Sequence, residues 1–326
     1  MTFEITSLIF VKIRKIMNKK RLIGLICAFW ATMCWASNYP LSRLIFKNCG
    51  AVDLDPWWSV WLRTAMGALV MLPFTFVVKE GSWGKFKTNW KKDWKIFLYL
   101  GLFLTLEAAF SFAAGKYTTA ARSSLFCNTS PVFTLLISFL CAKELLNGRK
   151  IMGVLMGLAG IIIAALSKGG DAFSAVGFST LAGDMLALLS GVFWALFTVF
   201  GGDASSKYHG AFCAAVYRFY GIVLMVPVLF FCNITFDLPL MVWVGLLFMA
   251  GVSGGLAVWL WSIAQKHVEP SILGSFGYLS ATGATLFSAI FLKEKITFPF
   301  IFAFILVLGA MALILKNDRK KESCSQ

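Results

Sequence analysis

Residues 117–144 read YTTAARSSLFCNTSPVFTLLISFLCAKE, and residues 267–294 read HVEPSILGSFGYLSATGATLFSAIFLKE. The two stretches align position by position without a gap, and each is an apolar run that ends in the same Lys-Glu pair. Within the alignment Ser130 meets Ser280 and Ala121 meets Ser271. The match extends toward the N-terminus of each copy, where these segments correspond: Gly24 to Ala36 with Gly183 to Ala195, and Arg63 to Pro73 with Arg218 to Pro227. The chain therefore contains an internal repeat.

The composition indicates that this repeat is embedded in lipid. Of 326 residues, 59% are hydrophobic and only 14% are charged, whereas a soluble domain carries about 25% charged residues. Aromatic residues make up 16% of the chain, which is typical of lipid-facing surfaces and interfacial belts. We therefore expect the lipid bilayer to be a partner of the whole chain.

Apolar runs of membrane-span length recur along the sequence. A transmembrane helix needs roughly 20 mostly apolar residues. Charges, Pro and Gly delimit ten such runs, at 22–46, 57–78, 95–114, 119–141, 150–167, 178–201, 211–232, 240–264, 271–292 and 297–315. The sequence thus predicts an all-α membrane protein with ten transmembrane helices. Its predicted parts are a basic cytoplasmic N-terminal tail at 1–21, five-helix repeats at 22–167 and 178–315, and a cytoplasmic C-terminal tail at 316–326.

The parity of the repeat predicts its topology. Five spans are an odd number, so the second copy enters the membrane from the side opposite to the first. Such inverted repeats are typical of secondary transporters, in which rocking of the halves lets one central site face either side in turn.

The basic residues indicate how the chain is oriented. They concentrate before residue 22 and at 79–95, 143–150 and 316–321, whereas the loops on the other side carry single lysines. Because cytoplasmic loops are enriched in Lys and Arg, we expect a multi-pass protein of the inner cell membrane with both termini in the cytoplasm.

Several functional classes lack their sequence signals. The net charge of +15 comes from short loops between apolar runs, so nucleic acid is not an expected partner. The eight cysteines form no C-x-x-C pair and are not expected to bind a metal or form a disulfide framework. His209 and His267 have no acidic cluster beside them, which argues against an enzyme, and a G-x-x-x-x-G-K-[ST] nucleotide motif is absent. We expect neither a cofactor nor a catalytic residue.

The chain after residue 22 resembles the EamA-type proteins of the drug/metabolite transporter superfamily. The resemblance is carried by Trp-Ala-Ser-Asn at 35–38, Arg-Thr-Ala-Met-Gly at 63–67, Ser-Pro-Val-Phe-Thr at 130–134, and the Glu144 and Glu294 span ends. It implies a ten-helix transporter of small molecules such as amino acids, nucleosides, sugar derivatives, polyamines or toxic compounds. In that family the last span of each repeat can form dimer contacts, so a homodimer is one expectation. The small-xxx-small faces at 153–160 and 303–310 are explained equally well by packing within one chain.

Glu107 is the acidic residue that most needs an explanation. It lies midway along the predicted span 95–114, and the second repeat has no acid in the matching region. A charge at this depth costs at least about 2.5–3.5 kcal/mol. An unduplicated carboxyl group therefore suggests substrate or proton handling, and the alternative is a structural carboxyl neutralised by an arginine.

Arg63 and Arg218 recur in both repeats, which favours a structural role for their charge. The alternative is that one of them binds a carboxylate or phosphate of the substrate.

The remaining candidates for substrate contact are polar or aromatic residues within the spans. Pro40 and Pro131 break their helices, and freed carbonyl groups near such breaks line cavities. Deep tryptophans suit apolar, aromatic or cationic groups, with ordinary packing as the alternative. The predicted substrate contacts are Trp35, Asn38, Tyr39, Glu107, Asn128, Ser130, Trp194, Ser253, Trp259 and Tyr278.

Together these features predict a secondary transporter of a small organic metabolite that works by alternating access. The apolar and aromatic character of the spans favours export of amino acids or related amphiphilic compounds. A nucleoside, sugar-derivative or drug transporter of the same fold is the main alternative, and a membrane-embedded enzyme is the third.

Overall fold

The computed structural model describes residues 19–38, 41, 55–77, 81–118, 120–142, 144–145, 147–166, 178–293 and 296–316. Tyr39, Glu294 and nearly all of both predicted tails lie outside the described residues. Within the described part every regular element is helical. The elements are α2 (Lys19–Ala36), α4 (Pro56–Val77), α5 (Ser82–Tyr117), α6 (Ala120–Cys127), α7 (Ser130–Cys141), α8 (Gly148–Leu166), α9 (Phe178–Lys207), α10 (Gly210–Leu229), α11 (Leu240–Phe248), the π-helix η2 (Met249–Leu256), α12 (Ala257–His267), α13 (Pro270–Leu292) and α14 (Phe298–Lys316).

Eight helical segments of the described chain are long and apolar enough to cross a membrane. They are Trp57–Val77, Ser82–Gly115, Arg122–Cys141, Gly148–Leu166, Phe178–Lys207, Gly210–Leu229, Leu240–His267 and Phe298–Leu315. Two further long helices are α2, which begins with Lys19-Lys20-Arg21, and α13, which contains Ser, Thr and Gly along its length. The fold is that of an all-helical, multi-pass membrane protein.

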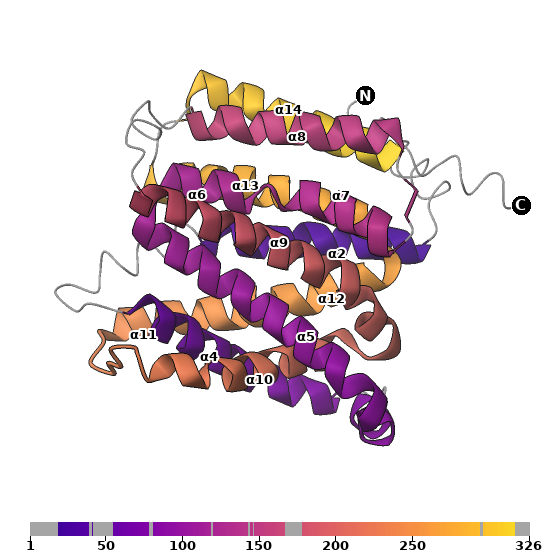
Figure 1. The fold of residues 1–326 in the computed structure, drawn as a ribbon, viewed down its shortest axis with the longest axis vertical. Coiled ribbons are helices and arrows are strands. Elements are labelled where there is room, and N and C mark those ends of the chain that lie inside the picture. The colour runs from indigo at the N-terminus through magenta and orange to yellow at the C-terminus, as the bar shows by residue number, and fades with distance from the viewer. Residues whose placement is uncertain are drawn as a thin grey trace, which may run out of the picture.

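The helices run roughly parallel or antiparallel in three groups (Figure 1). α8 and α14 pair along one edge, α4 and α10 pair along the other, and α2, α5, α6, α7, α9, α12 and α13 lie between them. We call the end of the bundle at which α2, α5, α8, α10 and α13 begin the first end. Polar contacts join these starts, for example the His209 N–H to Ser82 Oγ (3.1 Å) and Lys150 Nζ to Glu269 Oε2 (2.7 Å).

The α8–α14 pair depends on glycines. A Cβ atom at Gly153 would lie 2.5 Å from Ile314 Cγ1, and one at Gly160 would lie 3.0 Å from the Ala303 carbonyl oxygen. The small-residue face of α8 therefore packs against α14 of the same chain, as small-xxx-small faces do between membrane helices. The predicted homodimer stays a prediction.

α5 begins at Ser82, well before the apolar run predicted at 95–114. The preceding segment is basic rather than apolar, but lysine is a good helix former and the helix continues beyond the membrane-span length. Asp93 anchors this extension, because it accepts hydrogen bonds from Lys207 Nζ (3.0 Å) and Tyr208 Oη (2.6 Å). The extension thus fixes the start of α5 to the end of α9 at the first end.

Two helices in the middle group are interrupted near their centres. α6 ends at Cys127 and α7 begins at Ser130, with Pro131 in its first turn, where the missing proline N–H costs nothing. Between α11 and α12 the chain forms the π-helix η2, whose sequence MAGVSGGL is rich in glycine. Both interruptions lie beside the cavity described next, as π-helical segments often do at functional sites.

Candidate functional site

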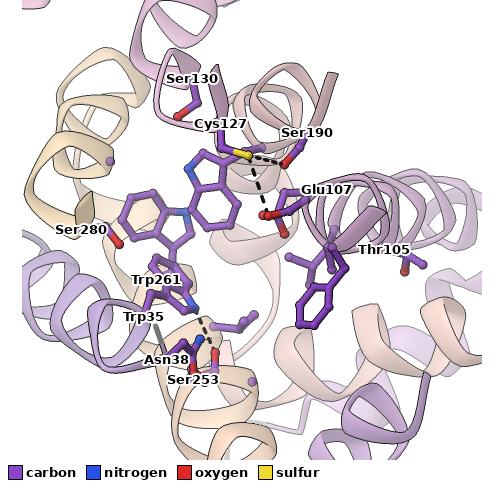
Figure 2. Close-up of a pocket in the computed structure, with 18 of the residues that line it drawn as sticks. Trp35, Asn38, Thr105, Glu107, Cys127, Ser130, Ser190, Ser253, Trp261 and Ser280 are labelled. Carbon is purple, nitrogen blue, oxygen red and sulfur yellow. Dashed lines mark hydrogen bonds between the residues drawn. The ribbon is translucent and has the colours of Figure 1, made fainter. Parts of the chain in front are cut away.

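A cavity of about 250 Å³ lies at the centre of the middle group of helices (Figure 2). It is lined from α2, α5, α6, α7, α9, η2, α12 and α13, and also from α4 and α10. The last two helices, α4 and α10, contribute Arg63 and Arg218 to the site. The predicted residues that line it are Trp35, Asn38, Arg63, Glu107, Asn128, Ser130, Trp194, Arg218 and Ser253.

Two predicted substrate contacts lie elsewhere. The Tyr278 ring packs against Gly157 of α8, and its hydroxyl donates to the Val154 carbonyl oxygen at 3.0 Å. Trp259 packs against Gly210 at the start of α10 and stacks obliquely with Phe74. Neither residue lines the cavity, because their positions on α13 and α12 face neighbouring helices. Tyr39 is not among the described residues.

Glu107 projects into the cavity from the last third of α5 (Figure 2). Arg63 and Arg218 are the charged groups that act on its carboxylate electrostatically. In the part of the chain that the structure describes, no ion pair within 4 Å joins Glu107 to either arginine. The cavity therefore contains a carboxylate and a guanidinium group, from Glu107 and Arg63, that are near each other but not in contact.

The two repeated arginines differ in their contacts. Arg218 is 8% exposed, and its Nε donates to the Gly254 carbonyl oxygen at 2.8 Å, with a second bond from Nη2 to the same oxygen. The Arg63 guanidinium lies over the Phe112 ring at 4.9 Å from the centroid. A cation over an aromatic face is held without using its N–H donors. Arg63 thus keeps hydrogen-bond donors for a ligand, whereas Arg218 is bound to the backbone of η2.

The π-helix η2 presents backbone carbonyl groups to the site. Besides Gly254, the Ser253 carbonyl oxygen accepts a hydrogen bond from Trp35 Nε1 at 2.9 Å. Ser253 Oγ also donates to Asn38 Oδ1 at 2.5 Å (Figure 2). These bonds join the end of α2 to η2, and they set the orientation of the Trp35 ring.

Three tryptophans form an apolar wall. The Trp35 ring lies 4.8 Å from Trp194 and 5.1 Å from Trp261 between centroids, and Trp194 and Trp261 are 5.4 Å apart. The contacts with Trp35 are edge-to-face, an arrangement that stabilises aromatic pairs. Below this wall, toward the first end, the core is closed by fully buried residues that include Phe97, Phe197 and Tyr217. The cavity thus combines polar groups with an aromatic floor.

A sequence model of the EamA-like transporter family matches residues 22–166 and again residues 181–316. The chain belongs to the EamA-like transporter family. The resemblance to the drug/metabolite transporter superfamily is thereby confirmed, and the protein is a multi-pass membrane transporter.

Relatives of this transporter have the same general description. An "Uncharacterized transporter" of Archaeoglobus fulgidus is 28% identical over 268 residues, which cover 81% of this chain and 87% of the relative. The "Uncharacterized transporter YvbV" of Bacillus subtilis is 24% identical over 307 residues, covering 93% and 94%. A solved crystal structure superposes with a TM-score of 0.76 at 19% identity, covering 92% of this chain and 98% of the other. That last likeness establishes the fold alone.

Several residues of the transporter's cavity were not predicted. Ser111 lies one helical turn after Glu107, and Cys127 Sγ lies 3.8 Å from both Ser111 Oγ and Ser190 Oγ. Trp261 and Ser280 also line the cavity. Helical spacing from Glu107 identifies Ser111, and the repeat identifies Ser280 as the partner of Ser130. Nothing in the sequence identifies Ser190.

No group of three or more His, Cys, Asp or Glu side chains in the described chain could hold a metal ion.

Proposed function

We propose that this transporter exports amino acids or closely related amphiphilic metabolites. The observation that carries the proposal is the pairing of charges in the cavity. A zwitterionic amino acid has an ammonium group that suits Glu107 and a carboxylate that suits Arg63, and the guanidinium group favours carboxylates through bidentate hydrogen bonds. The tryptophan wall suits an apolar side chain.

The size of the cavity supports a small substrate. Pockets for drug-sized ligands occupy roughly 300–1,000 Å³, and this cavity is about 250 Å³. An amino acid fits the smaller volume better than a nucleoside or a bulky drug does. The hydroxyl groups of Ser111, Ser130 and Ser280 provide further polar contacts on the cavity wall.

We further propose ten spans arranged as two inverted five-helix repeats, with a central site and alternating access. Two observations support this arrangement. The family match occurs once in each half. In addition, the main packing pairs are symmetric: α5 with α9 corresponds to α12 with α2 when the halves are exchanged, and α4–α10, α8–α14 and α7–α13 map onto themselves. A protein of this construction moves its site between the two sides of the inner membrane.

Uptake by proteoliposomes tests the proposal. Labelled amino acids and nucleosides are supplied with and without an inward proton gradient, for the parent and for Glu107→Gln. We expect uptake of amino acids, and a loss of about tenfold or more in Glu107→Gln, because a neutral amide cannot balance the substrate ammonium group.

The matched control is Asp203→Asn, which makes the same carboxylate-to-amide change at an exposed position of α9 outside the cavity. It should retain most of the uptake. Uptake of nucleosides but not amino acids, or an unchanged rate in Glu107→Gln, would contradict the proposal.

A further inference from the structure

The cavity lies between two sets of helices that are each well packed internally. In the first set, α5, α6 and α7 pack against α9, and in the second set α12 and α13 pack against α2. We call these unit one and unit two. Each contains helices from both halves of the sequence, so they differ from the sequence halves that were expected to rock.

A partly buried ionic cluster joins the two units at the first end, with Glu269 as its exposed member. Glu144 follows the last turn of α7 in unit one, whereas Glu269 and Ser271 start α13 in unit two. Lys150 Nζ of α8 lies 2.5 Å from Glu144 Oε1 and 2.7 Å from Glu269 Oε2. The Lys150 and Glu144 side chains are only 4% and 11% exposed. Ser271 Oγ donates to Glu144 Oε1, and the Ser271 N–H lies 3.3 Å from Glu144 Oε2.

A second polar contact joins the units beside this cluster. Gln265 of α12 is 7% exposed, and its Nε2 donates to the Phe197 carbonyl oxygen of α9 at 2.9 Å. Gly201 of α9 makes room for it, because a Cβ there would lie 2.2 Å from Gln265 Nε2. The first end is therefore closed by buried polar bonds between the units.

At the opposite end, Gln265, Ser271 and Lys150 have no polar counterpart, whereas Glu144 corresponds to Glu294, which lies outside the described residues. α5 and α12 end alike, since the Thr118 N–H donates to Ala114 O and the Val268 N–H to Ala264 O, both at 2.9 Å. Because Thr118 and Val268 are equivalent, Gly115 of α5 occupies the position that Gln265 has in α12. Gly115 has no side chain to make a polar contact, and a Cβ atom built there would meet no atom within 4 Å. The repeat likewise matches Ser271 with Ala121 and Lys150 with Phe300. The bonds made by Gln265, Ser271 and Lys150 are thus specific to the first end.

We propose that Glu144, Lys150, Glu269 and Ser271 form an ionic lock that holds the transporter closed at the first end. The inference rests on the proposed alternating access, in which unit two must separate from unit one at this end. Separation breaks the Glu144–Ser271 contact and moves Glu144 away from Glu269, so Lys150 can no longer bind both carboxylates. Because Phe300, Ala121 and Gly115 replace Lys150, Ser271 and Gln265 at the other end, the same set of bonds cannot form there, and the free energy of the two conformations is biased toward closure of the first end.

Amide hydrogen exchange of the purified parent protein and of Lys150→Met tests the lock without any substrate. We expect about tenfold faster exchange or more in residues 270–277 of α13, and also in 194–201 of α9, which lies across the interface and far from the substitution in sequence. Residues 120–127 of α6 should be unchanged. Lys150→Arg keeps the charge and should retain most of the protection.

Arg122→Met is the matched control, because it breaks the buried Arg122–Asp184 ion pair that joins α6 to α9 within unit one. It should speed exchange in α6 and leave 270–277 unchanged. If Lys150→Met fails to fold, Ser271→Ala removes one bond of the lock and should give a smaller change in the same segments.

Two results would overturn the lock. One is unchanged exchange at 194–201 in the variant, which would show only local fraying of α13. The other is an equal increase throughout the chain, which would show general destabilisation. Since exchange needs no transported compound, failure of the amino-acid panel would leave this result unaffected.

Discussion

Arg63 and Arg218 occupy matching positions in the two halves, yet their environments differ. Arg218 is bound to the Gly254 carbonyl oxygen, and a Cβ at Gly254 would lie only 3.2 Å from its guanidinium carbon. Replacing Arg218 with Met leaves a buried carbonyl without its charged donor. We expect a loss of about 1.5–3 kcal/mol in the free energy of unfolding, measured by thermal unfolding of the purified protein in detergent.

Arg63→Met should behave in the opposite way. Its guanidinium group lies over Phe112 and faces the cavity, so its removal costs little stability but removes the partner of a substrate carboxylate. We expect affinity for a bound amino acid to fall at least tenfold, about 1.4 kcal/mol, with little change in the melting temperature. Equal destabilisation by both substitutions would return Arg63 to the structural role that the repeat favours.

The sequence identifies the charged residues of the site but not the difference between the two arginines. Glu107 could be selected because an acid in mid-span is costly and has no repeat counterpart. The role of Arg218 depends on the π-helix η2, which no sequence pattern predicts. Trp259 and Tyr278 were selected as deep aromatics, but a helix has several faces, and periodicity in an apolar span does not show which face meets the cavity.

At the scale of elements, the packing of α8 against α14 makes a simple prediction. Gly153→Ala places a methyl group 2.5 Å from Ile314 and 3.0 Å from a carbonyl oxygen, so the helices must separate. We expect a melting temperature several degrees lower. Gly84→Ala, in α5, meets no atom within 4 Å and should leave it unchanged or slightly raised. Equal melting temperatures for the two variants would mean that the α8–α14 contact is looser than described.

Apolar runs predicted most helix positions because lipid requires about 20 apolar residues per span. The helices α4, α8, α10, α13 and α14 begin and end within three residues of their predicted runs. Ends outside the lipid are less predictable, and the early start of α5 shows why: a basic segment is free to remain helical when an acidic partner such as Asp93 anchors it. The break before Pro131 was predicted from proline geometry, whereas η2 was missed.

At the scale of the whole molecule, the proposed ten spans place both termini on the same side of the membrane. Tags at the N- and C-termini should therefore be cleaved by protease from the same face of sealed vesicles. The basic segments lie at the first end, which predicts that this end of the bundle faces the cytoplasm. Cleavage of the two tags from opposite faces would require an odd number of spans and would exclude the inverted five-helix repeat.

The repeat predicted two related halves, but not how they interleave. Sequence comparison shows which helices correspond, whereas the packing of α9 with α5 and of α2 with α12 depends on side-chain fit across helices far apart in the chain. For the same reason the Glu144–Lys150–Glu269 cluster could not be predicted, although the Lys-Glu motif that contributes Glu144 was visible in the repeat.

The most direct test of the central claim is binding of an apolar amino acid to the purified protein, compared with two derivatives by titration calorimetry. The methyl ester lacks the carboxylate that Arg63 would bind, and the N-acetyl form lacks the ammonium group that Glu107 would bind. We predict that the amino acid binds and that each derivative binds at least tenfold more weakly, about 1.4 kcal/mol each. Equal binding of all three compounds would contradict a cavity that recognises a zwitterion through Glu107 and Arg63.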